Sequence, residues 1–386
     1  MIKPGTHHWN AQQRVIYGKA AAQGVDEEVS AAKAERVLVA TTRSLTSGAL
    51  VAGVMDALGS RCVGKFDAIS AHTPRESVLA GAEQARSRQV DLIVAIGGGS
   101  VIDCAKAMLL CLWRDIRAAA AMDALLEAPL ESSAWDAAPQ RLRMMAVPTT
   151  LSAAEFSTSA GVTDVARHRK QRFNHPLIVP RSVVLDPVAT LDTPQELFLS
   201  SGMRAMDHAV ERWLSIAPTP YADAVSSQAM GMLAHALPAI RKHPEDLQAR
   251  LEAQMAAWLS TLGEAARTSV GASHGLGYIL GAVRGVPHGV TSCITLPAVL
   301  AWNEPVNAER QKLVSAKLGS PERRACDAMR DFVAALGVPY RLRDVDITQA
   351  DLADLASRYD GTGPISTNPR PVRGAQDLIE ILELAL

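Results

Sequence analysis

The stretch DLIVAIGGGSVIDCAK, from Asp91 to Lys106, decides the fold of this chain. A short apolar run rich in β-branched residues stops at three glycines, and an amphipathic segment follows at once. This pattern is typical of a buried parallel strand that turns directly into a helix. Glycines let a ligand approach the backbone, and the free N–H groups of the helix that opens at Ser100 suit a phosphate. The residues alone therefore favour a phosphate-binding loop over a plain turn, although they do not form the G-x-G-x-x-G pattern.

The composition is that of a globular protein with room for two domains. The chain has 386 residues, of which 48% are hydrophobic, and its net charge of -1 argues against nucleic acid or an anionic membrane as a partner. No apolar run approaches the ~20 residues that span a bilayer, and the first residues do not form a secretory signal. The 5 cysteines have no C-x-x-C spacing, which indicates reduced thiols. We therefore expect a cytoplasmic location.

The sequence around the opening stretch alternates short strands with helices. We predict strands at residues 14–18, 37–40, 63–68, 144–148 and 182–187, with helices between them. Thr73 is a candidate N-cap with Pro74 at the first helical position, and residues 118–140 predict a short helix and a loop. Such alternation predicts a parallel sheet that binds ligands at the carboxyl ends of its strands.

Polar residues follow two more of the predicted strands. Thr41 and Thr42 follow the strand at 37–40, while Thr149, Thr150 and Ser152 follow the strand at 144–148. Their hydroxyl groups could bind a phosphate or a ribose. A polar loop with an ordinary helix cap is the alternative, and the residues by themselves do not decide between the two.

Beyond residue 187 the periodicity is helical, with segments expected at 194–203, 204–216, 221–241 and 244–263. Arg204 and His208 share a helix face because they are four residues apart, and His274 and Tyr278 do the same. With His288, three imidazoles could fill three positions of a metal site, or each could be an ordinary core or surface histidine. Asp207 lies about 100° around the helix from His208, so it is predicted to point away from such a site.

These motifs, in this order, resemble the iron-containing (group III) alcohol dehydrogenase family, and more closely its maleylacetate reductase branch. The resemblance extends over nearly the whole chain. It rests on Gly97–Ser100 with Asp103 and Lys106, on Val147–Thr150, Leu185–Pro187, Ser201–Met203, His208–Glu211, His274 and Pro287–Gly289, and on His72–Pro74 for the reductase branch. It implies an α/β dinucleotide-binding domain over residues 1–187 and an all-helical domain over 188–386, with the active site in the cleft between them.

The resemblance also implies roles for the residues after the strands. Gly97, Gly98, Gly99 and Ser100 would hold the pyrophosphate of NAD(H) or NADP(H), with Thr149, Thr150 and Ser152 on the nicotinamide side and Thr41, Thr42 and Asp103 as further cofactor-binding residues. Arg43 stands where a carboxylate would select NAD, so the choice of coenzyme stays open. A small oxo or hydroxy substrate and a homodimer are expected on the same ground.

Two residues depart from the family pattern. Metal-dependent members carry an aspartate where this chain has Arg204, and a histidine is usual where it has Tyr278. A guanidinium stays charged and repels a divalent ion, so a complete Fe or Zn site is not expected. If any metal binds, His208, His274 and His288 would be its ligands.

The two departures suggest a replacement for the metal. Arg204, among His208, His274 and His288, could polarise a substrate carbonyl or clamp a carboxylate, and Tyr278 or a histidine could donate the proton. A structural ion pair of Arg204 with Asp207 or Glu211 is the alternative.

The sequence thus predicts an NAD(P)H-dependent reductase of a small oxo compound, with a keto acid such as maleylacetate as one candidate. Two other functions stay open. A dehydroquinate synthase-like lyase would use NAD only transiently and would need a metal with an acidic ligand. A member that has lost redox chemistry would bind a dinucleotide without net hydride transfer.

Overall fold

The computed structural model describes residues 6–126, 142–167 and 169–386, which form two compact units. An α/β unit spans Trp9–Asp192, and a helical unit spans Thr193–Leu386 together with the N-terminal residues up to His8. The chain passes from one unit to the other five residues beyond the expected boundary at residue 187. The reason is that the turn after Pro187 still belongs to the α/β core, where Ala189 is buried.

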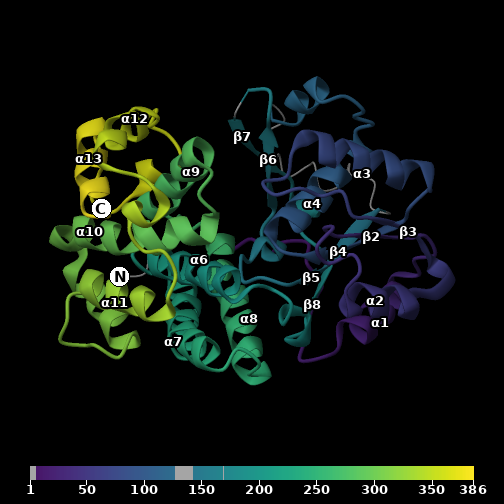
Figure 1. The fold of residues 1–386 in the computed structure, drawn as a ribbon, viewed down its shortest axis with the longest axis horizontal. Coiled ribbons are helices and arrows are strands. Elements are labelled where there is room, and N and C mark those ends of the chain that lie inside the picture. The colour runs from purple at the N-terminus through teal and green to yellow at the C-terminus, as the bar shows by residue number, and fades with distance from the viewer. Residues whose placement is uncertain (1–5, 127–141, 168) are drawn as a thin grey trace. The chain divides into compact units, whose positions relative to one another are not determined.

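The α/β unit is built on a six-stranded parallel sheet (Figure 1). Its strands, in spatial order, are β1 (Arg14–Tyr17), β8 (Ser182–Leu185), β5 (Arg143–Pro148), β4 (Leu92–Gly97), β2 (Val37–Ala40) and β3 (Cys62–Phe66). The helices are α1 (Ala21–Ala32), α2 (Ala49–Leu58), α3 (Arg75–Ser87) and α4 (Gly99–Trp113). The predicted class of fold is confirmed, and β4 is buried along its whole length because helices cover both faces of the sheet.

Alternate residues of the central strands enter different cores. Val37 and Val39 of β2 pack with Val25 of α1 and Val54 of α2 on one face. On the other face α3 packs on α4, and a Cβ atom at Gly81 would lie 2.7 Å from the sulfur of Met108. Because β2, β4 and β5 run parallel to one another, all three end at the same edge of the sheet.

A two-stranded antiparallel hairpin, β6 (Ser159–Asp164) and β7 (Arg169–Asn174), was not predicted from the sequence. The segment of β7 is RKQRFN, which carries little of the apolar pattern of a strand. Polar contacts to a buried arginine hold the hairpin instead. Arg75 of α3 donates from Nε to Oε1 of Gln171 (3.0 Å) and lies 3.5 Å from a carboxylate oxygen of Asp164.

The prediction that Thr73 caps α3 is wrong. The cap residue is Pro74, which makes no side-chain hydrogen bond, and Thr73 has a φ of 54°. Its hydroxyl donates to the carbonyl of Ser100 (3.0 Å), and its own carbonyl accepts from the backbone N–H of Thr163 (2.9 Å). His72 also has a positive φ, 61°, so two successive residues without a glycine take the left-handed conformation.

Between α4 and β5 the structure describes a 3-10 helix, Ala120–Leu125, within the segment where a short helix and a loop were predicted. The remainder of that predicted loop, residues 127–141, lies outside the described residues.

The helical unit contains eight α-helices among its described residues (Figure 1). They are α6 (Gln195–Trp213), α7 (Pro220–Lys242), α8 (Leu247–Thr261), α9 (Ala272–Arg284), α10 (His288–Lys317), α11 (Ala325–Leu336), α12 (Leu352–Ser357) and α13 (Ala375–Glu383). The two helices predicted at 194–203 and 204–216 are the single helix α6, because Gly202 is buried and stays helical. Helix α10 packs against α6, α9 and α11 and bends at Asn307, two residues after Pro305. Within the described ranges, no helix combines the length and the apolar character needed to cross a membrane.

Candidate active site

The three glycines after β4 form a cradle that a side chain would fill. Gly97 has a φ of 154°, and a Cβ atom there would lie 2.6 Å from Cγ2 of Val101. A Cβ atom at Gly98 would lie 2.9 Å from Cγ2 of Thr150. Helix α4 begins at Gly99, so its N-terminal N–H groups and the positive end of its dipole lie beside this cradle. The arrangement suits a phosphate of a dinucleotide.

The structure brings the predicted hydroxyl residues to this loop. The backbone N–H of Thr149 donates to the carbonyl of Gly97 (3.1 Å), and the hydroxyl of Thr150 lies 3.4 Å from that of Ser152. Oγ of Ser152 would be 3.0 Å from a Cβ atom at Gly99, so it directly overlies the backbone of the loop.

The two threonines after β2 make local contacts. The Thr41 hydroxyl donates to the carbonyl of Ile96 inside the sheet (2.9 Å), and the Thr42 hydroxyl lies 2.9 Å from that of Ser44. Thr41 therefore stabilises the end of β4, and the predicted roles of both residues in cofactor binding stay predictions.

Two further motif residues, Asp103 and Lys106, connect α4 to the segment after Thr149. Oδ2 of Asp103 accepts the backbone N–H of Gly161 (3.0 Å). The buried Nζ of Lys106 donates to the carbonyls of Ala154, Ser157 and Ser159 at 2.5, 2.8 and 2.9 Å. Both side chains thus fix the loop and the hairpin against α4. The cofactor contact predicted for Asp103 is not among the contacts of this structure and stays a prediction.

Arg204 lies inside the helical unit, with 7% of its surface exposed. Its Nη1 donates to Oγ of Ser292 (3.1 Å) and lies 3.5 Å from Oδ2 of Asp207. The guanidinium carbon is 5.7 Å from the centre of the Tyr278 ring. The ion pair with Asp207 that was an alternative from the sequence is therefore present, and it uses only one of the nitrogen atoms of the guanidinium.

The prediction that Asp207 points away from the histidines is wrong. Its fully buried Oδ2 accepts the hydroxyls of Ser273 (3.0 Å) and Ser292 (2.6 Å) and lies 3.3 Å from Nδ1 of His274. The reason is that α9 and α10 both pack on α6, so neighbouring positions on α6 face the same interior. Burial raises the pKa of Asp207 to about 6, against the opposing effect of Arg204.

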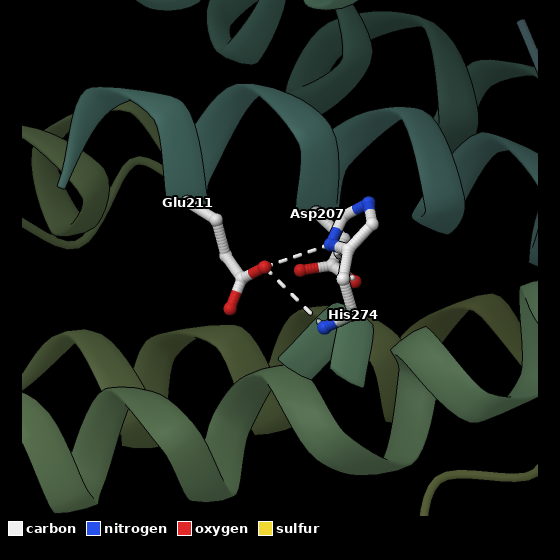
Figure 2. A group of neighbouring side chains, drawn as sticks. All are labelled: Asp207, Glu211 and His274. Atoms are coloured by element: carbon white, nitrogen blue, oxygen red, sulfur yellow. Dashed lines mark hydrogen bonds and ion pairs between the residues drawn. The ribbon is translucent and has the colours of Figure 1, made fainter. Parts of the chain in front are cut away.

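Glu211 is a second buried carboxylate, one helical turn after Asp207 (Figure 2). It accepts the backbone N–H groups of Gly271 and Ser273, both at 2.8 Å, and that of His274 at 3.3 Å. These donors lie at the start of α9, where a negative charge is favoured by the helix dipole. Its Oε2 is also 2.7 Å from Nδ1 of His274.

His274 is held between the two carboxylates. Its Nδ1 faces Glu211 and Asp207, while its Nε2 is buried and has no hydrogen-bond partner among the described residues. Burial, reinforced by the charge of Arg204, lowers the pKa of His274 to about 3, so the ring is neutral at physiological pH. The ring of His208 lies over it, with centroids 4.6 Å apart.

His288 and Tyr278 make a separate pair. Their ring centroids are 6.1 Å apart in an edge-to-face arrangement, and Tyr278 is 37% exposed. His288 is the first residue of α10, and its Cε1 would be 3.3 Å from a Cβ atom at Gly281. The ring of His288 is therefore turned toward α9.

The residues that could hold the metal implied by the family resemblance differ from the three predicted histidines. In the described part of the chain, the group whose ligand atoms converge is Asp207, Glu211 and His274, and not the three predicted histidines. The converging carboxylates already accept hydrogen bonds from N–H and hydroxyl donors, and the guanidinium of Arg204 lies 3.5 Å from one of them. A divalent ion would have to displace these donors and tolerate a fixed positive charge. A metal ion at Asp207, Glu211 and His274 would therefore compete with these donors, and the expected lack of a complete Fe or Zn site stays a prediction.

The sequence analysis named Glu211 only within a family motif and as a possible ion-pair partner of Arg204, and it missed Ser273 and Ser292 altogether. One signal was present, because Asp207 and Glu211 are four residues apart and therefore share a helix face. The two serines carry no comparable signal, since their importance depends on the packing of α9 and α10 on α6.

A parallel sheet with a glycine cradle, joined to a helical unit with a buried cluster of histidine, arginine and carboxylates, defines a class of nucleotide-dependent oxidoreductases. Comparison with known proteins identifies the family. Residues 12–187 match the model of the iron-containing alcohol dehydrogenases, and residues 198–386 match that of the C-terminal part of the same family. The chain belongs to the iron-containing alcohol dehydrogenase family.

Individual relatives of known sequence or structure align with this chain over most of its length. A dehydrogenase from Gibberella moniliformis is 30% identical over 97% of this chain and 96% of its own. A maleylacetate reductase from a Pseudomonas strain is 31% identical over 88% of this chain and 86% of its own. The crystal structure of maleylacetate reductase from a Rhizobium strain superposes with a TM-score of 0.83 at 26% identity, covering 100% of this chain and 99% of that one.

Proposed function

We propose that this protein is an NAD(P)H-dependent reductase of a small oxo acid that works without a bound metal ion. The proposal is supported by the family, by the maleylacetate reductases among its relatives and by the composition of the cluster around Arg204. In the overall reaction an oxo compound takes up a hydride from the reduced nicotinamide coenzyme and a proton. The products are the oxidised coenzyme and a hydroxy compound or, where the hydride adds to a conjugated C=C bond, the saturated oxo compound.

The coenzyme fits the glycine cradle. Gly97, Gly98 and Gly99 leave space that a Cβ atom would close, and α4 presents its N-terminus there. When bound, the nicotinamide coenzyme supplies the hydride. No carboxylate follows β2, where Arg43 stands exposed, so the fold permits NADPH as well as NADH.

The single observation that carries the proposal is the state of the Arg204 side chain. Its Nη1 is fixed by Ser292 and Asp207, whereas its Nε and Nη2 have no protein partner among the described residues. A buried guanidinium with two unpaired nitrogen atoms, which carry three N–H donors, is suited to an oxyanion or a carboxylate. Hydride addition to a carbonyl carbon, or to the conjugated position of an unsaturated ketone, places negative charge on the same oxygen. A positive group fixed beside that oxygen stabilises the transition state as a metal ion would.

A proton must then reach the oxyanion. Tyr278 and His288 lie next to each other, and Tyr278 is partly exposed and within 5.7 Å of the Arg204 guanidinium. We assign the proton donor to this pair. The assignment is preferred to His274, whose buried ring is neutral and whose Nδ1 is engaged with Glu211.

The test is turnover of a panel of oxo acids, including maleylacetate, followed by the loss of absorbance of NADH or NADPH. We expect Arg204→Ala to lower kcat/KM by about 100- to 1000-fold, as removal of one oxyanion donor does elsewhere. Arg204→Lys should recover only part of this, because an ammonium cannot reproduce the planar fork of donors. Arg310→Lys is the control, since Arg310 stacks on Trp213 at a different position. Activity of Arg204→Ala within threefold of the wild type would refute the role of Arg204.

Two alternatives make different predictions in the same experiment. Tight coenzyme binding without turnover of any oxo acid would favour a member that binds a dinucleotide without net hydride transfer. A lyase of the dehydroquinate synthase type would need a metal with an acidic ligand, and here the candidate carboxylates Asp207 and Glu211 already accept hydrogen bonds. Stoichiometric metal together with turnover that leaves the coenzyme unchanged would favour the lyase.

A further inference from the structure

A pocket of about 200 Å³ lies in the helical unit, and all of its lining residues belong to that unit. Its buried lining is apolar and consists of Ile294 and Pro297 of α10 and of Ala385, which follows α13. Ser292, the partner of Arg204, precedes Ile294 by two residues on α10, so the two side chains point about 200° apart around the helix. The pocket therefore lies on the side of α10 that faces away from the cluster around Arg204.

The charged side chains that line the pocket are all positive. They are those of Arg330 on α11 and of Arg341 and Arg343 in the segment between α11 and α12. Among the described residues of the lining there is no aspartate or glutamate. Tyr340 lines the pocket beside Arg341, whose guanidinium carbon is 4.8 Å from the centre of the tyrosine ring. The pocket thus joins an apolar wall to a positively charged one, which favours an anionic ligand.

Two of the three arginines are held in place by neighbours. Nη1 of Arg330 lies 3.3 Å from a carboxylate oxygen of Asp327 on the same helix. Nε of Arg343 donates to the main-chain oxygen of Leu386, which also lines the pocket. These contacts fix both side chains, and the carboxylate of Asp327 offsets part of the positive charge of Arg330.

Arg341 is the available cation of the pocket. Its side chain is exposed, stacks on Tyr340 and has no carboxylate partner in the described part of the chain. Asp344, three residues further on, uses its carboxylate to accept the backbone N–H groups of Tyr340 and Arg341, at 3.1 and 3.0 Å. The guanidinium of Arg341 therefore keeps donors that a ligand could use, and the stacking on Tyr340 reduces the number of orientations that it can take.

From these features we propose that the pocket binds a small carboxylic acid with an apolar body, such as an acid with a single aromatic ring. The two oxygen atoms of a carboxylate match the planar fork of the Arg341 guanidinium, and the body would replace water on the apolar wall of Ile294 and Pro297. Inorganic phosphate would leave that wall unfilled. A volume of about 200 Å³ is below the ~300–1,000 Å³ of pockets for drug-sized ligands, so a dinucleotide does not fit. The proposal goes beyond the proposed reductase activity and does not depend on it.

The first test uses benzoate as the probe and needs neither coenzyme nor substrate. Full-length protein is labelled with carbon-13 at the isoleucine methyl groups, and Ile294→Val assigns the NMR signal of Ile294. We expect benzoate to shift this signal saturably with a dissociation constant of about 1 mM or lower, and benzamide and inorganic phosphate to bind at least about tenfold more weakly. The absence of a saturable shift at about ten times that concentration would overturn the proposal. Benzamide binding as tightly as benzoate would exclude recognition of the charge, and phosphate binding as tightly would exclude the role of the apolar wall.

The second test compares Arg341→Gln with Arg373→Gln. Both arginines are exposed in the helical unit, but Arg373 does not line the pocket. We expect Arg341→Gln to weaken benzoate binding at Ile294 at least about tenfold, and Arg373→Gln to bind benzoate like the wild type. Arg341→Lys should weaken it less than Arg341→Gln, because an ammonium keeps the charge but not the planar fork. Unchanged binding in Arg341→Gln, or an equal loss in Arg373→Gln, would overturn the proposal, whatever reaction the protein catalyses.

Discussion

The glycine loop of the α/β unit and the buried cluster of the helical unit are two sites built on different principles. The loop is suited to bind a phosphate through backbone groups, because a Cβ atom at any of its three glycines would strike a neighbour and α4 offers N–H groups there. The cluster works through side chains, and Arg204 stands in it where the family pattern has an acid. A site made of backbone tolerates little substitution, whereas a side-chain site can change its chemistry on an unchanged frame. This difference explains why the sequence of the loop is enough to recognise the family. The chemistry of the cluster, in contrast, depends on which side chain stands at each position.

The buried carboxylates of the two regions show the same contrast. Glu155, beside the loop, is buried with Oε2 lacking a hydrogen-bond partner among the described residues, and burial raises its pKa to about 7. Glu211, in the cluster, accepts three backbone N–H groups and faces a histidine. Burial penalises an ionised carboxylate unless hydrogen bonds compensate for the lost water. Glu211 has three from backbone N–H groups of α9, whereas Glu155 has one from its own backbone.

After Arg204→Ala, the largest effect is expected from a substitution in the glycine loop. Gly98→Val would push its side chain into Thr150, since a Cβ atom already lies 2.9 Å from Cγ2 of that residue. Overpacking of this kind typically costs about 1–3 kcal/mol of folding stability. Because the loop must shift to relieve the clash and so changes the shape of the cradle, we also expect roughly 10- to 100-fold weaker coenzyme binding, a loss of about 1.4–2.7 kcal/mol. The measurement is the dissociation constant of NADH and NADPH by fluorescence titration.

The same substitution at two glycines provides the control for this test. Gly98→Ala, whose Cβ atom would lie 2.9 Å from Cγ2 of Thr150, should weaken coenzyme binding less than Gly98→Val does. A Cβ atom at Gly53, in the middle of α2, meets nothing within 4 Å. Gly53→Ala should therefore leave coenzyme affinity unchanged. If Gly98→Val bound the coenzyme as tightly as the wild type, the loop would not be the phosphate site.

The free energy of unfolding, measured as a function of pH, distinguishes the buried carboxylates of Glu155 and Glu211. The pKa of Glu155 in the folded protein, about 7, lies above its ordinary value of 4.5, so the folded state holds the proton more tightly. Its contribution to stability is complete below about pH 4.5 and is lost as the pH rises to about 7. Glu155→Gln removes this loss, and we expect it to raise the free energy of unfolding at pH 8 by about 1–2 kcal/mol relative to the wild type.

Urea denaturation of the wild type and Glu155→Gln at pH 5 and pH 8 measures this difference. The gain should be larger at pH 8 than at pH 5. Glu211→Gln should instead destabilise the protein, because it puts an NH₂ group among backbone donors. If Glu155→Gln and Glu211→Gln changed the free energy of unfolding equally, the two buried carboxylates would not differ in the way proposed.

A smaller effect is expected next to the glycine loop. His72 is exposed and has a φ of 61°, a conformation unfavourable by about 1 kcal/mol for residues other than glycine. His72→Gly should therefore stabilise the protein by about 0.5–1 kcal/mol, whereas His72→Ala should not. Thermal unfolding of the two variants checks this. A stabilising His72→Ala would show that the side chain, and not the backbone, is the source of the strain.

The smallest effect is expected from removal of metal ions. Because the histidines do not converge and the nearby carboxylates are hydrogen-bonded, dialysis against a chelator should change kcat/KM by less than about twofold. Metal analysis of the purified protein accompanies the assay. A stoichiometric Fe or Zn ion whose removal abolishes activity would show that the side-chain site has kept the chemistry of the metal-dependent members.

The sequence by itself determined the order of strands and helices, the position of the glycine loop and the family. These features depend on local patterns: period-two and continuous apolar runs, glycines at fixed positions, and spacing of four along helices. The hairpin of β6 and β7 could not be predicted in this way, because buried Arg75 holds it through polar contacts with residues far along the chain.

Only the tertiary structure decided the arrangement of the cluster. Whether Asp207 points toward His274 depends on how α9 and α10 pack on α6, and no helical spacing reports that. The same is true of Glu211, whose importance comes from the backbone N–H groups that reach it from the start of α9. Local sequence thus gave the side chains their chemistry, and the packing of helices distant in sequence decided which of them act together.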